Sequence, residues 1–526
     1  MISREEQILN IEKTKNWDFI IIGGGASGLG IVLDATSRGF KTVLFEGNDF
    51  AKGTSSKSTK LIHGGVRYLG QGDVRLVLEA LYERGILAKN AKHLFKNLSF
   101  IIPNYKWWKG YYYLIGLKIY DLLSRKLSLG KSKLIGAAKL LKIFPNLKEE
   151  SLLNGVVYHD GQFDDSRLAI NLAQTAIEQR ATILNYFKVV DILKDNNGKN
   201  EGVIVVDVET DKRYHVKSKC IINATGIFTD KILKINDPTH KKTVVPSRGI
   251  HLVFDKSFLD SDCAIMIPKT TDGRVLFIIP WHDKVLAGTT DTPVRKKTLD
   301  PVATKSEIDF ILNNVNQYFD NPPKKEDILS VFAGLRPLAA PEKDETKTKE
   351  VSRNHKIIVS ESNLISIVGG KWTTYRKMAE EVVDKSIQLH NYKMVKSQTE
   401  TLSIHGNIAN GQTLEHHLSI YGFDAKHIKD MEDSNILYSK KIHVNYPFTV
   451  AQIIWAVQHE MARSVEDVLA RRVRLLFLDA KAAIEASPIV AKTMAKELDK
   501  DEAWINEQTE KFKKVADKYV IDHYYE

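Results

Sequence analysis

A chain of 526 residues is longer than one hydrophobic core usually serves, so we expect two or three domains. Its 43% hydrophobic and 27% charged residues are those of ordinary globular protein. The two cysteines, Cys220 and Cys263, exclude a disulfide framework and have no metal-ligand spacing, which favours a reducing, cytoplasmic setting.

The net charge of +11 calls for an anionic partner, and three kinds compete: a small substrate, a membrane surface or a nucleic acid. Charge alone does not choose between them, because much of the excess is lysine scattered over predicted helices. Residues 1–16 are polar and mixed in charge, so we expect no signal peptide. No apolar run is long enough to span a bilayer, so we expect a protein that does not cross a membrane.

The segment 17–46 predicts a strand, a glycine turn, a helix and a second strand. Phe19–Ile22 is a short apolar run typical of a strand buried on both faces. Three glycines follow it in a G-x-G-x-x-G pattern: Gly23, Gly25 and Gly28. The exposed amides of the next helix, predicted over 26–37, are where a phosphate would lie. Glu46 ends the second strand, eighteen residues past the last glycine, where it can accept from a ribose hydroxyl, so we predict a dinucleotide site.

A hydroxyl-rich loop, GTSSKSTK, follows at residues 53–60 and runs into LIHGGVRY at 61–68. A nicotinamide enzyme of the classical type would continue with another crossover helix and strand. This loop is instead suited to hydrogen-bond a second phosphate and a ribityl chain, which predicts FAD held along its length. A flexible serine linker is the alternative, but such linkers seldom run straight into a histidine-glycine turn followed by Arg67 and Tyr68.

The stretch STKLIHGGVRYL, at this distance from the glycine pattern, resembles the FAD-dependent glycerol-3-phosphate dehydrogenases, respiratory enzymes that pass electrons to quinone. Five further motifs are similar to that family: NATG at 223–226, GTTD at 288–291, AGLRP at 333–337, GGKWTTYR at 369–376 and EDVLARR at 466–472. The likeness covers nearly the whole chain. It implies an α/β plus α+β fold with a Rossmann-like FAD-binding domain of the glutathione-reductase or D-amino-acid-oxidase type, an antiparallel-sheet substrate domain and a C-terminal helical domain.

Changes in composition along the chain suggest where these domains lie. We assign residues 1–100, 150–240 and 333–390 to a discontinuous FAD-binding domain, and residues 101–149 and 241–332 to the substrate domain, because short β-like runs divided by turns fill 241–332. Apolar residues thin out over 391–412, which predicts a linker, and the C-terminal domain over 391–526 is mostly helical. A Ser-x-x-Asp capping box opens a helix predicted over 464–486.

For two basic stretches, the sequence does not decide whether they contact lipid, solvent or the protein core. Residues 107–127 combine an aromatic cluster with an apolar helix carrying Lys118, Arg125 and Lys126, which suits a helix at a lipid interface. A core helix under the substrate domain with an aromatic lid is the alternative, and the sequence alone slightly favours it. In the C-terminal domain, we expect a scaffold, docking or dimer surface and interpret Arg471, Arg472 and Arg474 as helix-surface cations.

The expected cofactor contacts follow from these motifs. A strand over 364–368 feeds Gly369 and Gly370 and then a helix, whose start in flavoproteins of this architecture faces the flavin pyrimidine ring and stabilises the anionic reduced flavin. We expect FAD to be bound by Gly23, Gly25, Ala26, Ser27, Gly28, Glu46, Thr54, Ser55, Ser58, Thr59, Leu61, His63, Val189, Ala224, Thr225, Gly226, Gly370, Lys371, Trp372 and Thr373. We expect no metal.

Flavin-dependent oxidation of a secondary alcohol needs a base for the hydroxyl proton and anchors for the rest of the substrate. A phosphorylated substrate favours cationic anchors, and Arg67, Arg336, Arg353 and Lys371 match the cationic positions of the family. Tyr68 and Thr290 are expected to hydrogen-bond substrate oxygens. His63 and His251 are the candidates for the base, and the sequence does not rank them, because His63 can instead position the flavin ring.

The resemblance implies oxidation of sn-glycerol 3-phosphate to dihydroxyacetone phosphate, with electrons passed through FAD to a quinone. A glycerophosphate oxidase that uses oxygen is the main alternative, although the chain lacks the long insertion of those oxidases. An FAD-dependent amine or amino-acid oxidase and an RNA-modifying flavoprotein are weaker rivals, and the sequence has no recognised RNA module. We expect a cytoplasmic protein peripherally associated with the inner face of the cell membrane, in contact with anionic lipid, binding no nucleic acid, and able to form a homodimer.

Overall fold

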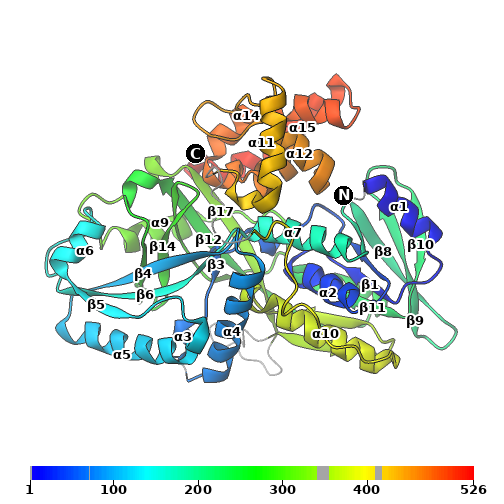
Figure 1. The fold of residues 1–526 in the computed structure, drawn as a ribbon, viewed down its shortest axis with the longest axis horizontal. Coiled ribbons are helices and arrows are strands. Elements are labelled where there is room, and N and C mark those ends of the chain that lie inside the picture. Colours follow the sequence, from blue (N-terminus) through cyan, green and yellow to red (C-terminus); the bar gives the residue numbers. More distant parts are fainter. Residues whose placement is uncertain (1–2, 70–71, 341–354, 409–416, 526) are drawn as a thin grey trace.

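The computed structural model describes residues 3–69, 72–340, 355–408 and 417–525. Two sheets lie side by side, and helices from the C-terminal part of the chain lie above them in the view of Figure 1. The N-terminal glycine pattern belongs to the sheet on the right, and the later β-rich segments belong to the sheet on the left. The site is built where these parts meet.

Six strands form the first sheet, in the order β18 (Lys356–Val359), β19 (Ile365–Val368), β11 (Cys220–Asn223), β1 (Phe19–Ile22), β2 (Thr42–Phe45) and β7 (Thr182–Leu184). All neighbours pair in parallel except β18 with β19, and Phe19 lies in register between Thr42 and Cys220. Every residue of β1, β2, β11 and β19 is buried, as their continuous apolar runs predict. The carboxyl ends of these strands meet at one edge, which is where open parallel sheets bind ligands.

Successive residues of β1 pack on opposite sides of this sheet. Phe19 and Ile21 pack against α2 (Ala26–Ser37), α7 (Asp165–Glu178) and α10 (Tyr375–His390). Ile20 and Ile22 pack against a small antiparallel sheet of β8 (Phe187–Lys194), β9 (Asn200–Asp207) and β10 (Arg213–Lys217), with α1 (Arg4–Lys13) and α8 (Thr229–Asn236) beside it. The helix predicted over 26–37 has these bounds in the structure, and both faces of the sheet are covered.

Ten strands form the second sheet, which is largely antiparallel. They are β3 (Leu61–Ile62), β4 (Lys96–Asn104), β5 (Lys133–Gly136), β6 (Asn154–Gln162), β12 (Val244–Asp255), β13 (Ala264–Ile267), β14 (Leu276–Trp281), β15 (Lys284–Gly288), β16 (Thr292–Pro293) and β17 (Ser330–Ala339). Only β4 and β13 pair in parallel among the described strands of this sheet. Since β3, β6 and the larger parts of β4 and β17 come from segments assigned to the FAD-binding domain, we propose domain boundaries that group these four strands with the substrate domain.

A basic segment, residues 106–142, includes a helix that lies below this sheet in Figure 1, strand β5 of the sheet and most of the helix that follows β5. It holds nine lysines and arginines and one acid, Asp121, whose carboxylate accepts hydrogen bonds from Ser132. Its helix α5 (Trp107–Ser124) packs on the β6 side through Leu117 and Tyr120, and α6 (Ala137–Ile143) follows. The opposite face of α5 is solvent-exposed and apolar, with relative exposures of 73% at Trp107 and 76% at Leu122. The interpretation of α5 as a core helix is therefore wrong for this face.

The C-terminal part is helical, as predicted, with α11 (Ala425–Ser434), α12 (Val450–Glu460), α13 (Leu475–Leu478), α14 (Ala480–Glu497) and α15 (Glu502–Ala516). Two further helices, α3 (Val66–Leu69) and α4 (Val74–Asn90), pack against each other and against α5. The helix predicted over 464–486 is instead broken into a π-helical turn (Asp467–Arg472), α13 and α14, because Arg474 adopts φ 67°. The predicted capping box is present, since Asp467 N donates to Ser464 Oγ at 3.3 Å. None of the helices in the described parts of the chain is both long and apolar enough to cross a membrane.

Candidate active site

A cavity of about 840 Å³ runs between the carboxyl edge of the first sheet and the inner face of the second. Most of its lining residues fall in three groups: the turns after β1, β2, β11 and β19, the cofactor loop (residues 46–61), and residues of β12, β14, β17 and the turn after β15. Nearly all the predicted cofactor and catalytic residues line this one cavity: Gly23, Gly25, Ala26, Ser27, Glu46, Thr54, Ser55, Ser58, Thr59, Leu61, His63, Val189, Ala224, Thr225, Gly226, His251, Thr290, Arg336, Gly370, Lys371, Trp372 and Thr373. Segments more than 300 residues apart are thus brought to one site.

The glycine turn after β1 has no room for side chains. Gly23 has φ +111°, and a Cβ there would lie 2.7 Å from the carbonyl oxygen of Ala224. A Cβ on Gly28 would lie 1.8 Å from the carbonyl oxygen of Gly23, so the third glycine allows α2 to pack against the turn. Gly28 itself does not line the cavity. The first two glycines therefore form a cradle that lets a ligand approach the backbone, and the third supports it from behind.

Glu46 directly follows β2 and lines the cavity. Its two carboxylate oxygens accept from the backbone amides of Gly24 at 2.7 Å and Asn48 at 2.9 Å. Burial raises the pKa of this carboxyl group, while the two amides lower it. Each oxygen keeps a second lone pair, so the carboxylate can accept from ribose hydroxyl groups in a fixed orientation.

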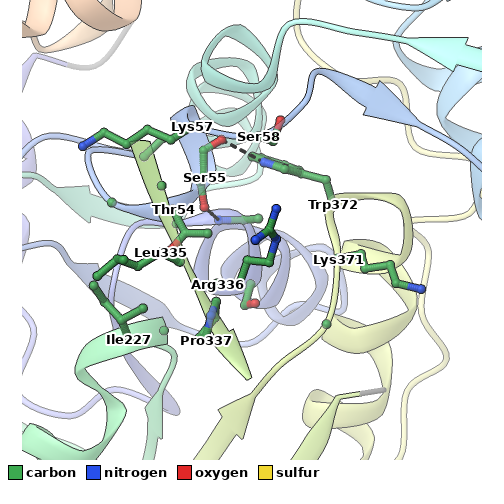
Figure 2. Close-up of a pocket in the computed structure, with 18 of the residues that line it drawn as sticks. Thr54, Ser55, Lys57, Ser58, Ile227, Leu335, Arg336, Pro337, Lys371 and Trp372 are labelled. Carbon is green, nitrogen blue, oxygen red and sulfur yellow. Dashed lines mark hydrogen bonds between the residues drawn. The ribbon is translucent and has the colours of Figure 1, made fainter. Parts of the chain in front are cut away.

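The cofactor loop is held in place by its own hydroxyl groups (Figure 2). Thr54 Oγ1 donates to the carbonyl oxygen of Leu335 at 2.6 Å, and Ser55 Oγ accepts from the Ala26 amide at 3.0 Å. Trp372 Nε1 donates to the carbonyl oxygen of Ser55 at 2.9 Å. Ser58 Oγ points to the buried Asp165 at 2.7 Å. The loop therefore joins the start of α2, strand β17 and the turn before α10, all of which belong to the cavity wall.

The strand-to-helix turn after β19 places backbone amides at the cavity. Gly369 and Gly370 have φ values of +80° and +89°, and a short 3₁₀ turn, Trp372–Thr374, leads into α10. The helix therefore begins at Tyr375 rather than at Trp372 or Thr373, while the residues of the turn line the cavity. In Figure 2 the Lys371 side chain points away from the Arg336 guanidinium group. The structure thus places Lys371 at the cavity wall without bringing these two cations together.

Arg336 reaches the cavity from β17. Its Nη2 donates to Thr289 Oγ1 at 3.0 Å, its Nη1 lies 3.4 Å from Asp291 Oδ1, and its side chain is 27% exposed. Thr290 Oγ1 accepts from the Ile250 amide at 3.1 Å, so this hydroxyl is already oriented by β12. The sequence analysis includes the GTTD motif but gives no role to Asp291, whose carboxylate contacts the Arg336 guanidinium group. The motif is the sequence signal from which a role for Asp291 could have been predicted.

The two candidate bases differ in their surroundings. His251, on β12, is 1% exposed, stacks on Phe332 with ring centres 4.8 Å apart, and its Nε2 lies 3.0 Å from Thr59 Oγ1. Burial and the charges of Lys60 and Arg336 hold the pKa of this imidazole well below its usual range. Its Nδ1 has no hydrogen-bond partner among the described residues. His63 is half-buried beside β3 and lines the same cavity, and its carbonyl oxygen accepts from Thr373.

Three predicted substrate residues are not located by their side chains. Arg67 and Tyr68 belong to α3, directly after Gly65 and Val66 of the cavity wall, but their side chains lie outside the described part of the structure. Arg353 lies outside the described residues altogether. The convergence of these cations on the cavity therefore stays a prediction.

Comparisons with known proteins agree with this geometry. Residues 18–376 match the family model described as FAD dependent oxidoreductase, and residues 360–505 match the C-terminal domain of alpha-glycerophosphate oxidase. The chain is 38% identical to the mitochondrial glycerol-3-phosphate dehydrogenase of Macaca fascicularis over 97% of this chain and 75% of that protein. It is also 38% identical to the enzyme of that name from Schizosaccharomyces pombe, over 98% of this chain and 89% of that protein.

The chain belongs to the FAD-dependent glycerol-3-phosphate dehydrogenase family. A solved structure of a glycerol-3-phosphate dehydrogenase from Bacillus halodurans, complexed with FAD, has a TM-score of 0.81 and 29% identity over 99% of both chains. An L-alpha-glycerophosphate oxidase from Mycoplasma pneumoniae shares the fold, with a TM-score of 0.56 and 18% identity. The predicted fold class and cofactor are confirmed.

The residues of this family member fit FAD. A Cβ at Gly23 or Gly25 would crowd the Ala224 carbonyl oxygen or the Ser55 hydroxyl group, so the turn stays free of side chains. The amides at the start of α2 suit a diphosphate, and the Glu46 oxygens suit a ribose. The cavity volume of about 840 Å³ lies within the range of ligand sites. We propose that the cavity-lining residues above hold the dinucleotide and its flavin ring.

One expectation about the family's EDVLARR motif is wrong. We call residues 464–474 the arginine segment, and its Arg471, Arg472 and Arg474 are at most 2% exposed, so they are not helix-surface cations. Arg471 and Arg472 both donate to Asp49, and Arg474 donates to Asp165 at 3.0 Å. Helix periodicity gives no sign of the pairing with Asp49 and Asp165, because these two carboxylates lie more than 300 residues away in the sequence.

Proposed function

We propose that this protein oxidises sn-glycerol 3-phosphate to dihydroxyacetone phosphate by hydride transfer to bound FAD and passes the electrons to a membrane quinone. The observation that carries the proposal is that Arg336, Thr290 and His251 line the same cavity as the turn before α10. A guanidinium group oriented by Thr289 and Asp291 offers a fixed fork for a phosphate. The names of the relatives, which match over nearly the whole chain, support the same substrate.

The residues divide the work between anchoring and proton transfer. FAD, when bound, accepts the hydride. Arg336, with Arg67 and Arg353 as further candidates, binds the phosphate and so orients the carbinol carbon. The low pKa of His251 leaves its ring neutral at neutral pH, with a lone pair that can accept the hydroxyl proton as the alcohol is oxidised. His63 is proposed to position the substrate or the ring system rather than to act as the base. The second sheet covers the site and excludes water.

Anaerobic mixing of the purified holoprotein with glycerol 3-phosphate tests this function. We expect the flavin absorption band to bleach with this compound and to persist with glycerol or with amino acids. Bleaching by glycine or another amine, without bleaching by glycerol 3-phosphate, would contradict the proposal and favour an amine oxidase.

Residues 360–505 match a glycerophosphate oxidase domain, so oxygen is a second candidate for the electron acceptor. Turnover with a quinone analogue, with hydrogen peroxide measured in parallel, separates the two. We expect quinone reduction with little peroxide. Peroxide formed in equal amount to the oxidised substrate would make the protein an oxidase.

We propose that the basic segment mediates peripheral contact with an anionic membrane at the inner face of the cell membrane. Trp107, Trp108, Tyr111 and Tyr112 are between 47% and 73% exposed on α5, and exposed aromatic side chains beside cations suit a helix at a lipid interface. Eight of the nine basic residues of the segment are exposed, so cations flank the apolar face. Each cation near an anionic surface adds about 1 kcal/mol to binding.

Co-sedimentation of the holoprotein with vesicles tests this surface. We expect binding to vesicles containing phosphatidylglycerol and little binding to pure phosphatidylcholine. The double variant Trp107→Ser/Leu122→Ser should lower vesicle binding at least tenfold while leaving turnover with a soluble dye acceptor unchanged. Unchanged vesicle binding in this variant would reject α5 as the membrane-contacting face. A homodimer, also proposed, is tested by light scattering.

A further inference from the structure

The cofactor loop has two sides, and each side meets a different part of the molecule. Twelve of its residues line the cavity, among them Glu46, Lys52, Thr54 and Ser55. Of the remaining four, Asp49 and Ser56 are bonded to the arginine segment, and Lys60 joins them through Asp165. None of residues 464–474 lines the cavity in the described structure. The arginine segment therefore touches the back of the wall whose front faces the cofactor.

The contacts are spread along the whole loop. At its start, Asp49 accepts from Arg471 Nε at 2.5 Å and from Arg472 Nη1 and Nη2 at 2.7 and 3.0 Å. In its middle, Lys52 Nζ donates to Glu466 Oε2 at 2.9 Å. The contacts at the end of the loop are made by Arg474.

Arg474 Nη2 donates to the carbonyl oxygen of Ser56 at 3.1 Å and to Asp165 Oδ1 at 3.0 Å. The other oxygen of Asp165 accepts from Lys60 Nζ at 2.7 Å and from the amide and hydroxyl of Ser58. One short segment thus holds the loop at its beginning, middle and end.

These contacts lie in a buried, charged environment. Asp49, Arg472 and Arg474 are at most 1% exposed. Burial alone would raise the pKa of the Asp49 carboxyl group, but the two guanidinium groups lower it to about 2. A charge buried this deeply is strongly unfavourable once its partner is lost, so loop and segment must keep their mutual position. The loop has little regular structure of its own beyond the short turn Thr54–Ser56.

We propose that the arginine segment is the positioning element of the FAD site, and that FAD binding and docking of this segment on the cofactor loop are thermodynamically coupled. A loop ordered from behind loses less conformational entropy when the cofactor binds in front. Coupling of this kind is reciprocal, so FAD must in turn stabilise the docked segment, although the two do not touch. The inference needs FAD binding alone and holds whichever substrate is oxidised.

The substitution Arg472→Lys tests whether docking of the arginine segment strengthens FAD binding. It keeps the positive charge but removes the planar guanidinium group that donates two hydrogen bonds to Asp49. The matched control is Arg38→Lys. Arg38 is likewise buried and paired with two carboxylates, Asp34 and Asp384, but does not line or support the cavity. FAD is titrated into each apoprotein by fluorescence quenching, and the thermal midpoint of each apoprotein is measured.

We expect Arg472→Lys to raise the Kd for FAD by about tenfold and Arg38→Lys to leave it within about twofold, because coupling energies are usually worth about 5- to 150-fold. A purely structural role predicts instead that both variants lower the thermal midpoint and neither changes the Kd for FAD. That result would overturn the proposal.

Hydrogen exchange of the unmodified protein tests the reverse half and does not depend on any variant folding. Amide exchange is compared with and without FAD in residues 464–474 and, as an internal reference, in α15. We expect FAD to slow exchange in the arginine segment at least about fivefold and to leave α15 unchanged. Equal exchange of the segment in both states would refute the coupling.

Discussion

The basic segment and the arginine segment place their cations in opposite environments. In the basic segment, eight of nine cations are exposed, and the one acid, Asp121, accepts from Ser132 and forms no ion pair with the residues that the structure describes. In the arginine segment, Arg471, Arg472 and Arg474 are buried, and each meets one or more carboxylates. The comparison teaches that positive charge in this protein serves two purposes, one directed at partners outside the fold and one at joining distant segments within it.

The largest difference between the two segments should appear in how much a substitution in each lowers the stability of the protein. Arg472→Met leaves Asp49 with a buried, partly unpaired charge, so we expect the free energy of unfolding to fall by about 3–5 kcal/mol. Lys118→Met, on the exposed face of α5, should change it by no more than about 0.5 kcal/mol. Urea denaturation of both variants measures the difference. Similar losses in the two would remove the distinction between the segments.

Arg336 lies in a third environment, because it is a partly exposed cation in the cavity. Its substitution should lower activity more than stability. Arg336→Lys keeps the charge but loses the fork held by Thr289 and Asp291, so kcat/KM for glycerol 3-phosphate should fall roughly a hundredfold, or about 3 kcal/mol. Arg125→Lys, exposed in the basic segment, is the control and should not change turnover with a soluble acceptor. An unaltered kcat/KM in Arg336→Lys would exclude Arg336 as a phosphate anchor.

The buried His405 should make the stability of the protein depend on pH. His405 lies 2.5 Å from Glu178 and 2.7 Å from Asp424; burial alone would lower its pKa, but the two carboxylates raise it to about 9. Because this pKa is above the unfolded value of about 6.5, the stabilisation is complete below pH 6.5 and is lost as the pH rises through about 9.

We therefore expect His405→Gln to lower the free energy of unfolding by roughly 2–3 kcal/mol at pH 6 and by little above pH 9.5. Urea denaturation at both pH values measures this. A loss that is the same at the two pH values would show that the imidazole does not titrate in this way.

The smallest effect concerns single cations of the basic segment. Lys118→Gln should weaken binding to anionic vesicles by about 1 kcal/mol, or roughly fivefold, and raising the salt concentration should reduce this difference. The thermal midpoint should not change, because Lys118 is exposed. Vesicle co-sedimentation at two ionic strengths provides the measurement. A difference that does not depend on salt would argue against an electrostatic contact.

Much of the cofactor site could be predicted because its signals are local. The glycines at 23, 25 and 28, the hydroxyl-rich loop and the strand before Gly369 each combine a motif with its neighbouring element. The third glycine of this motif is the one expected to allow close helix packing, and Gly28 does so by letting α2 approach Gly23, although it does not line the cavity. The role of Asp291 was missed because its partner Arg336 lies 45 residues away on another strand.

The sequence by itself determined the family, the strand–glycine–helix order of the FAD site and the helical C-terminal part, because these depend on periodicity and spacing within short stretches. Only the tertiary structure decided which cations are buried. A basic helix has the same pattern whether its charges meet water, lipid or a carboxylate from a distant segment. The free energy of each arrangement depends on desolvation and on partners brought close by folding, and neither is encoded in spacing along the chain.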